Sequence, residues 1–381
     1  MRLHVFITLP LLLLVAHVHA QTQSAPLPDG LYAEVTTPRG IIIGELYYQR
    51  VPMTVANYVG LAEGTLGPQP RKPFFDTTTF HRVVPNFVVQ GGSPTPDGEG
   101  DAGYKFPDEI VPGLRHDSLG VMQMANDGPD TNGSQWCFML GEFNRLNYNH
   151  TVFGHVVRGE EVLPRIQQGD TMKVRILRIG DEAKAFKADE TAFKALAAKA
   201  KPYTGPKAPA PDAFFDDPDK LLPTEWSRAA TFNFKLANVE RFTGIRIVAR
   251  LLAQPPEGQS IDAYLTTLAD KMKTGDTGAV ALYIAQNDQW YFHFGKAAEA
   301  SFIAGPREKN GTKKPLPPNS IEVSLREFLT SSRAQSARVI AAAEKAATTQ
   351  PVANTQKLKL QVDAVLDNLI FRLEPEPSAR P

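Results

Sequence analysis

The chain has 381 residues, with 41 basic and 41 acidic side chains, 31 prolines and one cysteine. This length is enough for about two to three domains, each able to bury its own core. The zero formal charge argues against a nucleic-acid binder, which needs clustered Lys and Arg to contact phosphates. The single Cys137 excludes an intramolecular disulfide framework and a thiolate zinc cage.

The first twenty residues have the pattern of a secretory signal. Arg2 precedes the apolar run Val5–Val15, and small residues lead to Ala20. The run is shorter than the ~20 apolar residues that a spanning helix needs. We therefore predict cleavage near Ala20, an extracytoplasmic (periplasmic or secreted) location, and no membrane span after signal removal. An uncleaved N-terminal anchor is the alternative.

Residues 30–180 are predicted to form mostly short strands. A hairpin turn at Pro38–Gly40 is expected to join two β-rich runs, and Pro52–Glu63 has helical spacing with proline in the first turn. A second helix is expected over Gly159–Gln168. The remaining β-rich runs are Thr79–Gln90, Ser118–Ala125, Gln135–Leu140, Val152–Val157 and Val174–Ile179. Many short strands with two helices predict a mainly β domain, a closed antiparallel barrel.

The composition changes after residue 180. Asp181–Lys201 is rich in Ala and Lys and predicts a helix, and prolines between Pro202 and Pro223 predict a semi-rigid linker, so 181–224 is assigned to helix and linker. Residues 225–375 are predicted to form an α/β or α+β domain. Its expected elements are a strand over Ile245–Leu252, a helix capped by Ser260, a hairpin of Ala279–Ala285 and Gln289–Gly295, a helix opened by the box Ser324–Glu327, and an amphipathic helix over Leu358–Leu373.

Two long strings in residues 30–180 carry the functional signal, namely Phe80–Gly92 (FHRVVPNFVVQGG) and Met124–Gln135 (MANDGPDTNGSQ). With Thr54–Leu61 upstream and His150–Gly154 downstream, this region closely resembles the cyclophilins, the peptidyl-prolyl cis-trans isomerases. The resemblance covers roughly two fifths of the chain. It implies an eight-stranded antiparallel barrel with two capping helices, which agrees with the predicted elements. It also implies an isomerase that binds proline-containing peptides and needs no cofactor.

Rotation about an X–Pro bond is slow because amide resonance must be lost, with a barrier of ~18–20 kcal/mol. In the twisted state the prolyl nitrogen regains a lone pair, so a cationic donor aimed at that nitrogen favours the twisted state. Arg82 is the candidate catalytic residue, because a guanidinium donates without losing its charge. If Thr79–Gln90 is one strand, Arg82 and Gln90 share a face by parity.

The resemblance assigns the other site residues. Phe87, Val88 and Leu146 would hold the proline ring, with Cys137 where the family usually has Phe. The groups expected to bind the substrate backbone or line the rim are Gln90, Gln135, Ala125, Asn126 and His150. Arg145 stands where many members carry a Trp that contacts cyclosporin, which predicts weak cyclosporin binding. His81 is interpreted as structural.

No other chemistry has a comparable signal. The histidines after the signal show no metal spacing such as H-x-x-x-H, so no metal site is predicted. Cys137 lies in an apolar run, which favours a buried small hydrophobe over a nucleophile.

Arg241–Phe294 resembles the extracytoplasmic TPM domain, but Gly275–Gly278 replaces that family's acidic turn. An accessory or docking domain of another α/β type is the alternative, and the sequence identifies neither a partner nor site residues for it. For the whole chain two hypotheses remain. One is an isomerase that assists folding of unfolded exported proteins; the other is a non-catalytic proline-peptide-binding chaperone or scaffold module.

Overall fold

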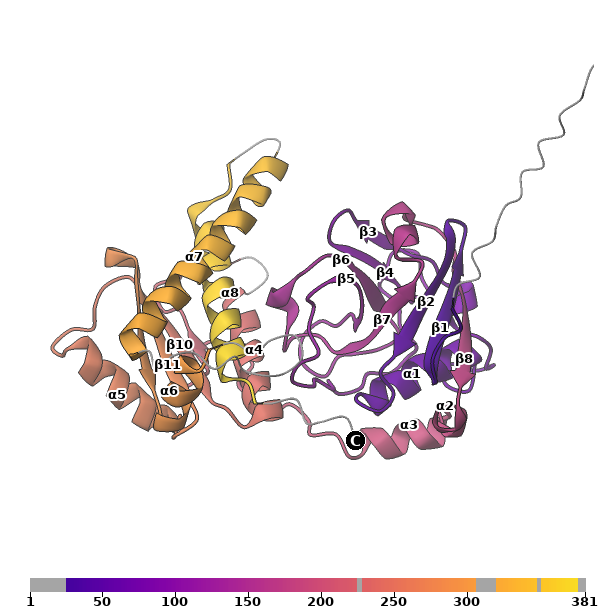
Figure 1. The fold of residues 1–381 in the computed structure, drawn as a ribbon, viewed down its shortest axis with the longest axis horizontal. Coiled ribbons are helices and arrows are strands. Elements are labelled where there is room, and N and C mark those ends of the chain that lie inside the picture. The colour runs from indigo at the N-terminus through magenta and orange to yellow at the C-terminus, as the bar shows by residue number, and fades with distance from the viewer. Residues whose placement is uncertain (1–24, 225–227, 306–319, 348–350, 376–381) are drawn as a thin grey trace, which may run out of the picture.

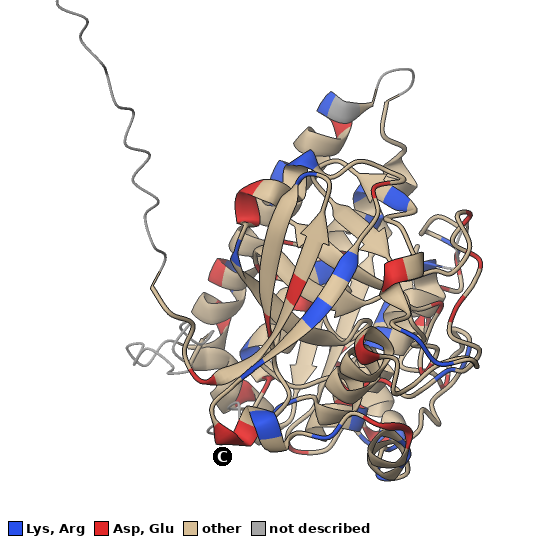
Figure 2. Ribbon diagram, turned by 90° about the vertical axis from the view of Figure 1, so that its right-hand side faces the viewer, with Lys and Arg blue, Asp and Glu red and all other residues tan. Residues whose placement is uncertain are grey.

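The computed structural model describes residues 25–224, 228–305, 320–347 and 351–375. The expected signal at residues 1–20 lies outside these ranges. Two domains follow each other along the chain, a strand-rich one and a mixed helix-and-sheet one (Figure 1). Acidic and basic residues are interspersed along the ribbon (Figure 2). Among the described residues, no helix is long and apolar enough to cross a membrane.

The first domain is an eight-stranded antiparallel sheet that curls on itself. Its strands are β1 (Gly30–Thr37), β2 (Gly40–Leu46), β3 (Arg82–Val84), β4 (Val88–Gly91), β5 (Leu119–Met124), β6 (Trp136–Leu140), β7 (Val152–Arg158) and β8 (Lys173–Ile179). The order is β3-β4-β6-β5-β7-β2-β1-β8. We expected a closed barrel, but β3 and β8 do not pair as regular strands. Outside the regular strands, a bridge from Thr79 to Thr171 links the two ends of the sheet. Phe80 adds two backbone hydrogen bonds of 2.9 Å, donating to the Asp170 carbonyl and accepting from the Gly169 N–H.

One of the two expected helices of this domain is an α-helix. It is α1 (Pro52–Glu63), with the same bounds as predicted and proline in its first turn. The segment expected as a second helix forms only a 3₁₀ turn, η3 (Glu160–Arg165). Pro164 lies inside that turn and has no N–H to donate, which disfavours an α-helix there.

The Ala- and Lys-rich segment is broken into two short helices instead of one. These are α2 (Asp181–Ala185) and α3 (Glu190–Ala197). Between them the chain is extended at Phe186, and the Asp189 carboxylate caps α3 by accepting the Ala192 N–H at 2.9 Å. Two further 3₁₀ turns lie in the first domain, η1 (Phe75–Thr77) and η2 (Asn144–Leu146).

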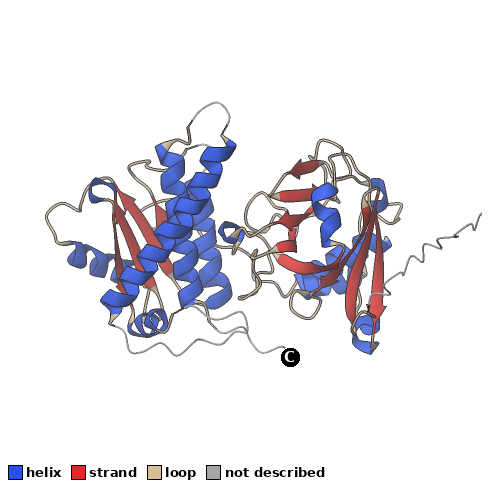
Figure 3. Ribbon diagram, turned by 45° about the horizontal axis from the view of Figure 1, so that its top comes forward, coloured by secondary structure: helices blue, strands red, loops and turns tan. Residues whose placement is uncertain are grey.

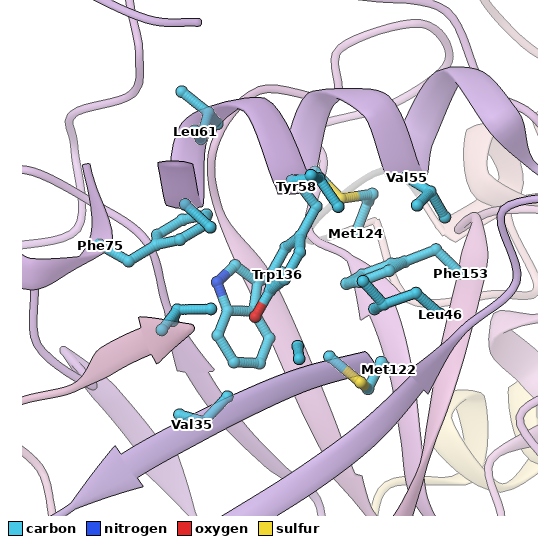
Figure 4. Close-up of a cluster of buried hydrophobic side chains, with 14 of the residues drawn as sticks. Val35, Leu46, Val55, Tyr58, Leu61, Phe75, Met122, Met124, Trp136 and Phe153 are labelled. Carbon is cyan, nitrogen blue, oxygen red and sulfur yellow. The ribbon is translucent and has the colours of Figure 1, made fainter. Parts of the chain in front are cut away.

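Aromatic rings fill the centre of the first domain around Trp136 (Figure 4). The Trp136 ring meets Phe138 at 4.8 Å and Tyr58 at 5.3 Å, both edge to face. Tyr58 comes from α1, so the helix is held against the inner face of the curled sheet. This core fixes the position of β6, whose outer face carries part of the site.

The second domain is built on a four-stranded sheet in the order β12-β11-β10-β9. Its strands are β9 (Phe215–Asp216), β10 (Ile247–Leu252), β11 (Ala279–Ile284) and β12 (Gln289–Phe294). β9 and β11 run parallel to β10, while β12 is antiparallel to β11 through the short turn η5 (Ala285–Asn287). β9 lies in the segment that we expected to be linker.

Helices cover both faces of this sheet (Figure 3). The helices are α4 (Arg228–Thr243), α5 (Ile261–Met272), α6 (Lys296–Ile303), α7 (Ile321–Ala346) and α8 (Asn354–Leu373). In β10, Val248 points to the cluster under α5, while Ile247 and Ala249 point to the cluster that contains residues of α4, α6, α7 and α8. Successive side chains of β10 therefore point to opposite faces of the sheet, and both faces are buried by helices.

The capping predictions for this domain had different outcomes. Ser260 caps α5 as predicted, with its hydroxyl accepting the Ala263 N–H at 3.2 Å. The prediction that Ser324 opens the next helix is wrong. α7 begins one turn earlier with Ser320 as its cap, and Ser324 is buried inside the helix.

Polar groups join the two domains. The Tyr148 hydroxyl donates to the Glu374 carboxylate at 2.6 Å, and Arg241 of α4 donates to Asp130 at 2.7 Å. The Asn238 side-chain amide also donates to the Tyr148 carbonyl at 2.9 Å. These contacts place α8 beside the loops that follow β6.

Candidate active site

The strand expected over Thr79–Gln90 is in fact a hairpin of β3 and β4. The chain turns at Pro85–Phe87, with Asn86 at a φ of 60°. Arg82 pairs directly with Gln90 across the two antiparallel strands. The two side chains therefore share a face as predicted, but the cause is cross-strand pairing and not parity within one strand.

A chain of polar side chains begins at Arg82. Its Nη1 donates to Gln90 Oε1 at 3.1 Å, and Gln90 Nε2 donates to Gln135 Oε1 at 2.9 Å. Gln135 Nε2 in turn donates to the carbonyl oxygens of Gly98 and Gly100 at 2.6 and 2.9 Å. Both glutamine amides are thereby fixed in orientation, and they hold the exposed guanidinium at the end of the chain.

An apolar cluster lies beside these polar groups, separate from the core around Trp136. Cys137 of β6 pairs with Gln90 of β4, so the cluster and the polar chain share the same strands. Cys137 is 3% exposed, and burial raises the pKa of its thiol to about 12. This supports the interpretation of Cys137 as a small hydrophobe. The buried members are Val88, Val121, Cys137, Met139 and Val152, and the part-buried ones include Phe87, Ala125, Phe143 and Leu146.

The remaining predicted residues lie at the end of β5 and in the loop before β7. The Ala125 N–H donates to the Gln135 carbonyl at 3.0 Å, so Ala125 is adjacent to the polar chain. The Asn126 side chain donates to the Asn149 carbonyl at 2.8 Å. His150 Nδ1 lies 3.2 Å from the Met124 carbonyl, and burial lowers the pKa of His150 to about 4. His150 is therefore neutral at pH 7.

The structure adds two residues that the sequence did not assign to the site. The Phe143 ring meets the Phe87 ring edge to face at 4.8 Å. The Arg145 guanidinium carbon lies 4.8 Å from the centroid of Phe87 and 4.9 Å from that of Phe143. Phe143 directly precedes the irregular turn η2, and Arg145 lies within it. The sequence of such a turn has no periodic pattern that would mark a residue as part of a pocket. Arg145 was noted only as a departure from the family.

The structural role of His81 stays a prediction, and its side chain is buried. It is 9% exposed, and burial lowers its pKa. Across the part of the chain that the structure describes, no group of three or more His, Cys, Asp or Glu side chains could hold a metal ion.

The geometry combines a fixed cation, two amides of fixed orientation and an apolar cluster within one short hairpin and its neighbours. Such a site can hold a small apolar ring, bind a peptide backbone on each side of it, and donate a hydrogen bond to the backbone between them. It contains no nucleophile in reach of a base among these residues, because the one thiol is buried and protonated. The chemistry that fits is a conformational change of a bound peptide without bond cleavage.

Comparison with known proteins identifies the family. The family model for cyclophilin type peptidyl-prolyl cis-trans isomerases matches residues 32–181. The probable peptidyl-prolyl cis-trans isomerase A of Mycobacterium leprae (strain TN) is 45% identical over 149 residues, which cover 37% of this chain and 81% of that protein. The peptidyl-prolyl cis-trans isomerase CYP18-2 of Arabidopsis thaliana is 42% identical over 36% of this chain and 83% of that protein.

A solved structure is also similar. It is a cyclophilin type isomerase of Cryptosporidium parvum, crystallised in the presence of the dipeptide Ala-Pro, with 26% identity and a TM-score of 0.35 over 39% of this chain and 99% of that one. With most of each relative's length covered at more than 40% identity, the chain belongs to the cyclophilin-type peptidyl-prolyl cis-trans isomerases.

Proposed function

We propose that this isomerase accelerates X–Pro rotation in unfolded exported polypeptides, with Arg82 as its catalytic residue and no cofactor. The observation that carries the proposal is the hydrogen-bonded chain from Arg82 through Gln90 to Gln135, lying directly beside the cluster of Phe87, Val88 and Cys137. The proline ring would enter that cluster. The prolyl nitrogen would then lie near the guanidinium.

The peptide backbone would be bound by the amides of Gln90 and Gln135 and by main-chain groups near Ala125 and Asn126. Leu146 and His150 would line the rim. His150 stays neutral because of its burial, so it offers the substrate no positive charge at pH 7. The two cations at the site are then Arg82 and Arg145, and the Arg145 guanidinium lies over the rings of Phe87 and Phe143.

Arg82 alone can supply only part of the transition-state stabilisation that the isomerase needs. An acceleration of ~10⁵ requires about 7 kcal/mol of transition-state stabilisation. The Arg82 guanidinium is exposed in the free protein, so a bound peptide must shield it from water. One donor aimed at developing electron density in such a shielded site is worth about 3–4 kcal/mol. The remainder would come from holding the peptide in a twisted geometry and from binding the proline ring in the apolar cluster.

The apolar run after Arg2 and the small residues before Gln21 support export. Mass spectrometry of the protein secreted by an expressing cell tests this part. We expect a mature chain that begins at Gln21, and recovery of the intact chain from the cytoplasm alone would contradict export.

The experiment for the catalytic role measures cis-trans exchange of a short Ala-Pro peptide by NMR, with wild type, Arg82→Ala and Arg82→Lys. We expect Arg82→Ala to lower kcat/KM by ~10²–10³, and Arg82→Lys to recover only a part because an ammonium lacks the planar fork. Wild-type exchange at the uncatalysed rate would favour the alternative, a non-catalytic proline-peptide-binding module. Equal rates for Arg82→Ala and wild type would remove Arg82 from the mechanism.

A further inference from the structure

A cleft among the described residues lies between the two domains, next to the apolar cluster around Phe87, Val88 and Cys137, which is the proposed proline-binding cluster. It has a volume of about 560 Å³, which is in the range of sites that hold ligands. One wall is formed by the loops around residues 110–115 and 142–148 of the first domain. The other wall is formed by α7 and α8, which pack against each other beside the first domain (Figure 1).

The cleft is continuous with the proline-binding cluster. Phe143 and Leu114 line the cleft and also pack against the cluster of Val88 and Cys137. Arg145 lines the cleft too, and its guanidinium lies over the ring of Phe87, which belongs to the cluster. A polypeptide whose proline occupies the cluster would therefore have its neighbouring residues beside the cleft.

The charged groups on the α8 wall are already neutralised within the protein. Asp367 pairs with Lys235, Asp363 pairs with Lys359 at 2.5 Å, and Glu374 pairs with Arg115. Buried charges with internal partners offer little to an ionic ligand. The same wall offers apolar surface from Leu360, Ala364 and Phe371 of α8 and from Val339 of α7, which is 46% exposed. Its other polar members are Gln335, Ser336, Arg338 and Asn368.

From this continuity and this chemistry, we infer that the cleft is an extended subsite for the substrate polypeptide. Its occupant would be an apolar or aromatic side chain of the same unfolded segment, a few residues away from the bound proline. The C-terminal domain would then select clients by the residues that flank proline. The inference rests on the proposed function, because it places the proline in the cluster beside Phe87.

The test uses the full mature chain and a matched pair of variants on α7. Val339→Glu puts a charge at the apolar cleft, and Val323→Glu does the same at a residue of similar exposure (40%) that does not line it. Both positions are exposed, so folding should tolerate the changes. The substrates are a tetrapeptide with a central proline and two 12-residue peptides with Leu and Phe on the amino or the carboxyl side of proline.

We expect Val339→Glu to lower the ratio of kcat/KM for a 12-residue peptide to that for the tetrapeptide by 5- to 20-fold, through KM. Anisotropy of the labelled 12-residue peptide should show weaker binding by a similar factor. Val323→Glu should match wild type, and the two peptide series report which side of proline enters the cleft. Equal ratios for both variants and wild type, with normal tetrapeptide turnover, would overturn the inference alone. Absent tetrapeptide turnover in wild type would instead overturn the proposed function.

Discussion

Gln90 occupies the middle of the polar chain that orients the guanidinium of Arg82, the proposed catalytic residue. It accepts from Arg82 and donates to Gln135 at the same time, so both neighbours depend on it. An arginine side chain that is exposed and unrestrained would have many rotamers available, and fixing one of them is what the glutamine contributes. Gln90 is in this respect a positioning residue as well as a candidate for backbone binding.

We predict that Gln90→Ala lowers kcat/KM by about tenfold, equivalent to ~1.4 kcal/mol. In Arg82→Ala, where no guanidinium remains to be positioned, the further change Gln90→Ala should have a smaller effect. The measurement is NMR exchange on the short Ala-Pro peptide for both singles and the double. Gln49→Ala is the control, since Gln49 donates only to Glu182 outside the site. Strict additivity of the two changes would contradict the positioning role.

Among the elements, the β3–β4 hairpin shows why a correct pairing can be predicted for the wrong reason. The run Thr79–Gln90 is β-rich throughout, and its only turn signal is Pro85–Asn86. Two strands of three and four residues are too short for their periodicity to differ from that of one long strand. Arg82 and Gln90 fall on one face in either arrangement, so the pairing did not depend on recognising the turn.

The helix starts in the second domain show a second limit of prediction from local sequence. Ser260 follows Pro- and Gly-rich chain, so a single cap position was available there. Ser320 and Ser324 lie one turn apart, and both precede residues with helical spacing. Local pattern cannot separate two such caps; the packing of the first turn of α7 decides in favour of Ser320.

The N-terminal cap of α5 by Ser260 should contribute measurably to the stability of the second domain. Ser260→Ala removes the acceptor for the Ala263 N–H and should lower the free energy of unfolding of the second domain by about 1 kcal/mol. Ser260→Asp should keep most of the stability, because a carboxylate also accepts at a helix N-terminus. Urea titration followed by amide signals of β10 and β11 measures both. A loss of equal size in the two variants would contradict the capping role.

For the whole molecule, the site and the second domain are joined by contacts that no local pattern contains. Tyr148 and Glu374 are 226 positions apart, and Arg115 and Glu374 are 259 apart. The sequence motifs were sufficient to identify the family, and they named the residues that we propose to bind proline. They could not place α8 beside η2, because that placement depends on which of many exposed polar side chains are paired across the domain boundary.

Burial lowers the pKa of three histidines of the first domain, His81, His116 and His150, so each of them contributes to the loss of stability in acid. His116 is fully buried, and its neighbour Arg115 contacts α8. Burial lowers the pKa of His116 from 6.5 to about 3, and the hydrogen bond to Asn147 opposes only part of this effect. In the unfolded chain the imidazole takes up a proton near pH 6.5. Between pH ~6.5 and ~3 the unfolded state therefore binds more protons, so the contribution of His116 to stability is present above pH 6.5 and is lost as the pH falls.

Asp108 changes the stability in the opposite direction, because burial raises the pKa of its carboxyl group to about 6. Its contribution to the free energy of unfolding therefore falls as the pH rises from 3.8 to 6. The two effects partly cancel in wild type, so the informative quantity is the difference between variants. We predict that the slope of unfolding free energy against pH between pH 4 and 6 is lower in His116→Gln than in wild type by up to ~1.4 kcal/mol per pH unit, one proton. Urea titrations followed by amide signals of β6 measure this slope, and equal slopes in the two proteins would show that His116 is not the group that takes up the proton.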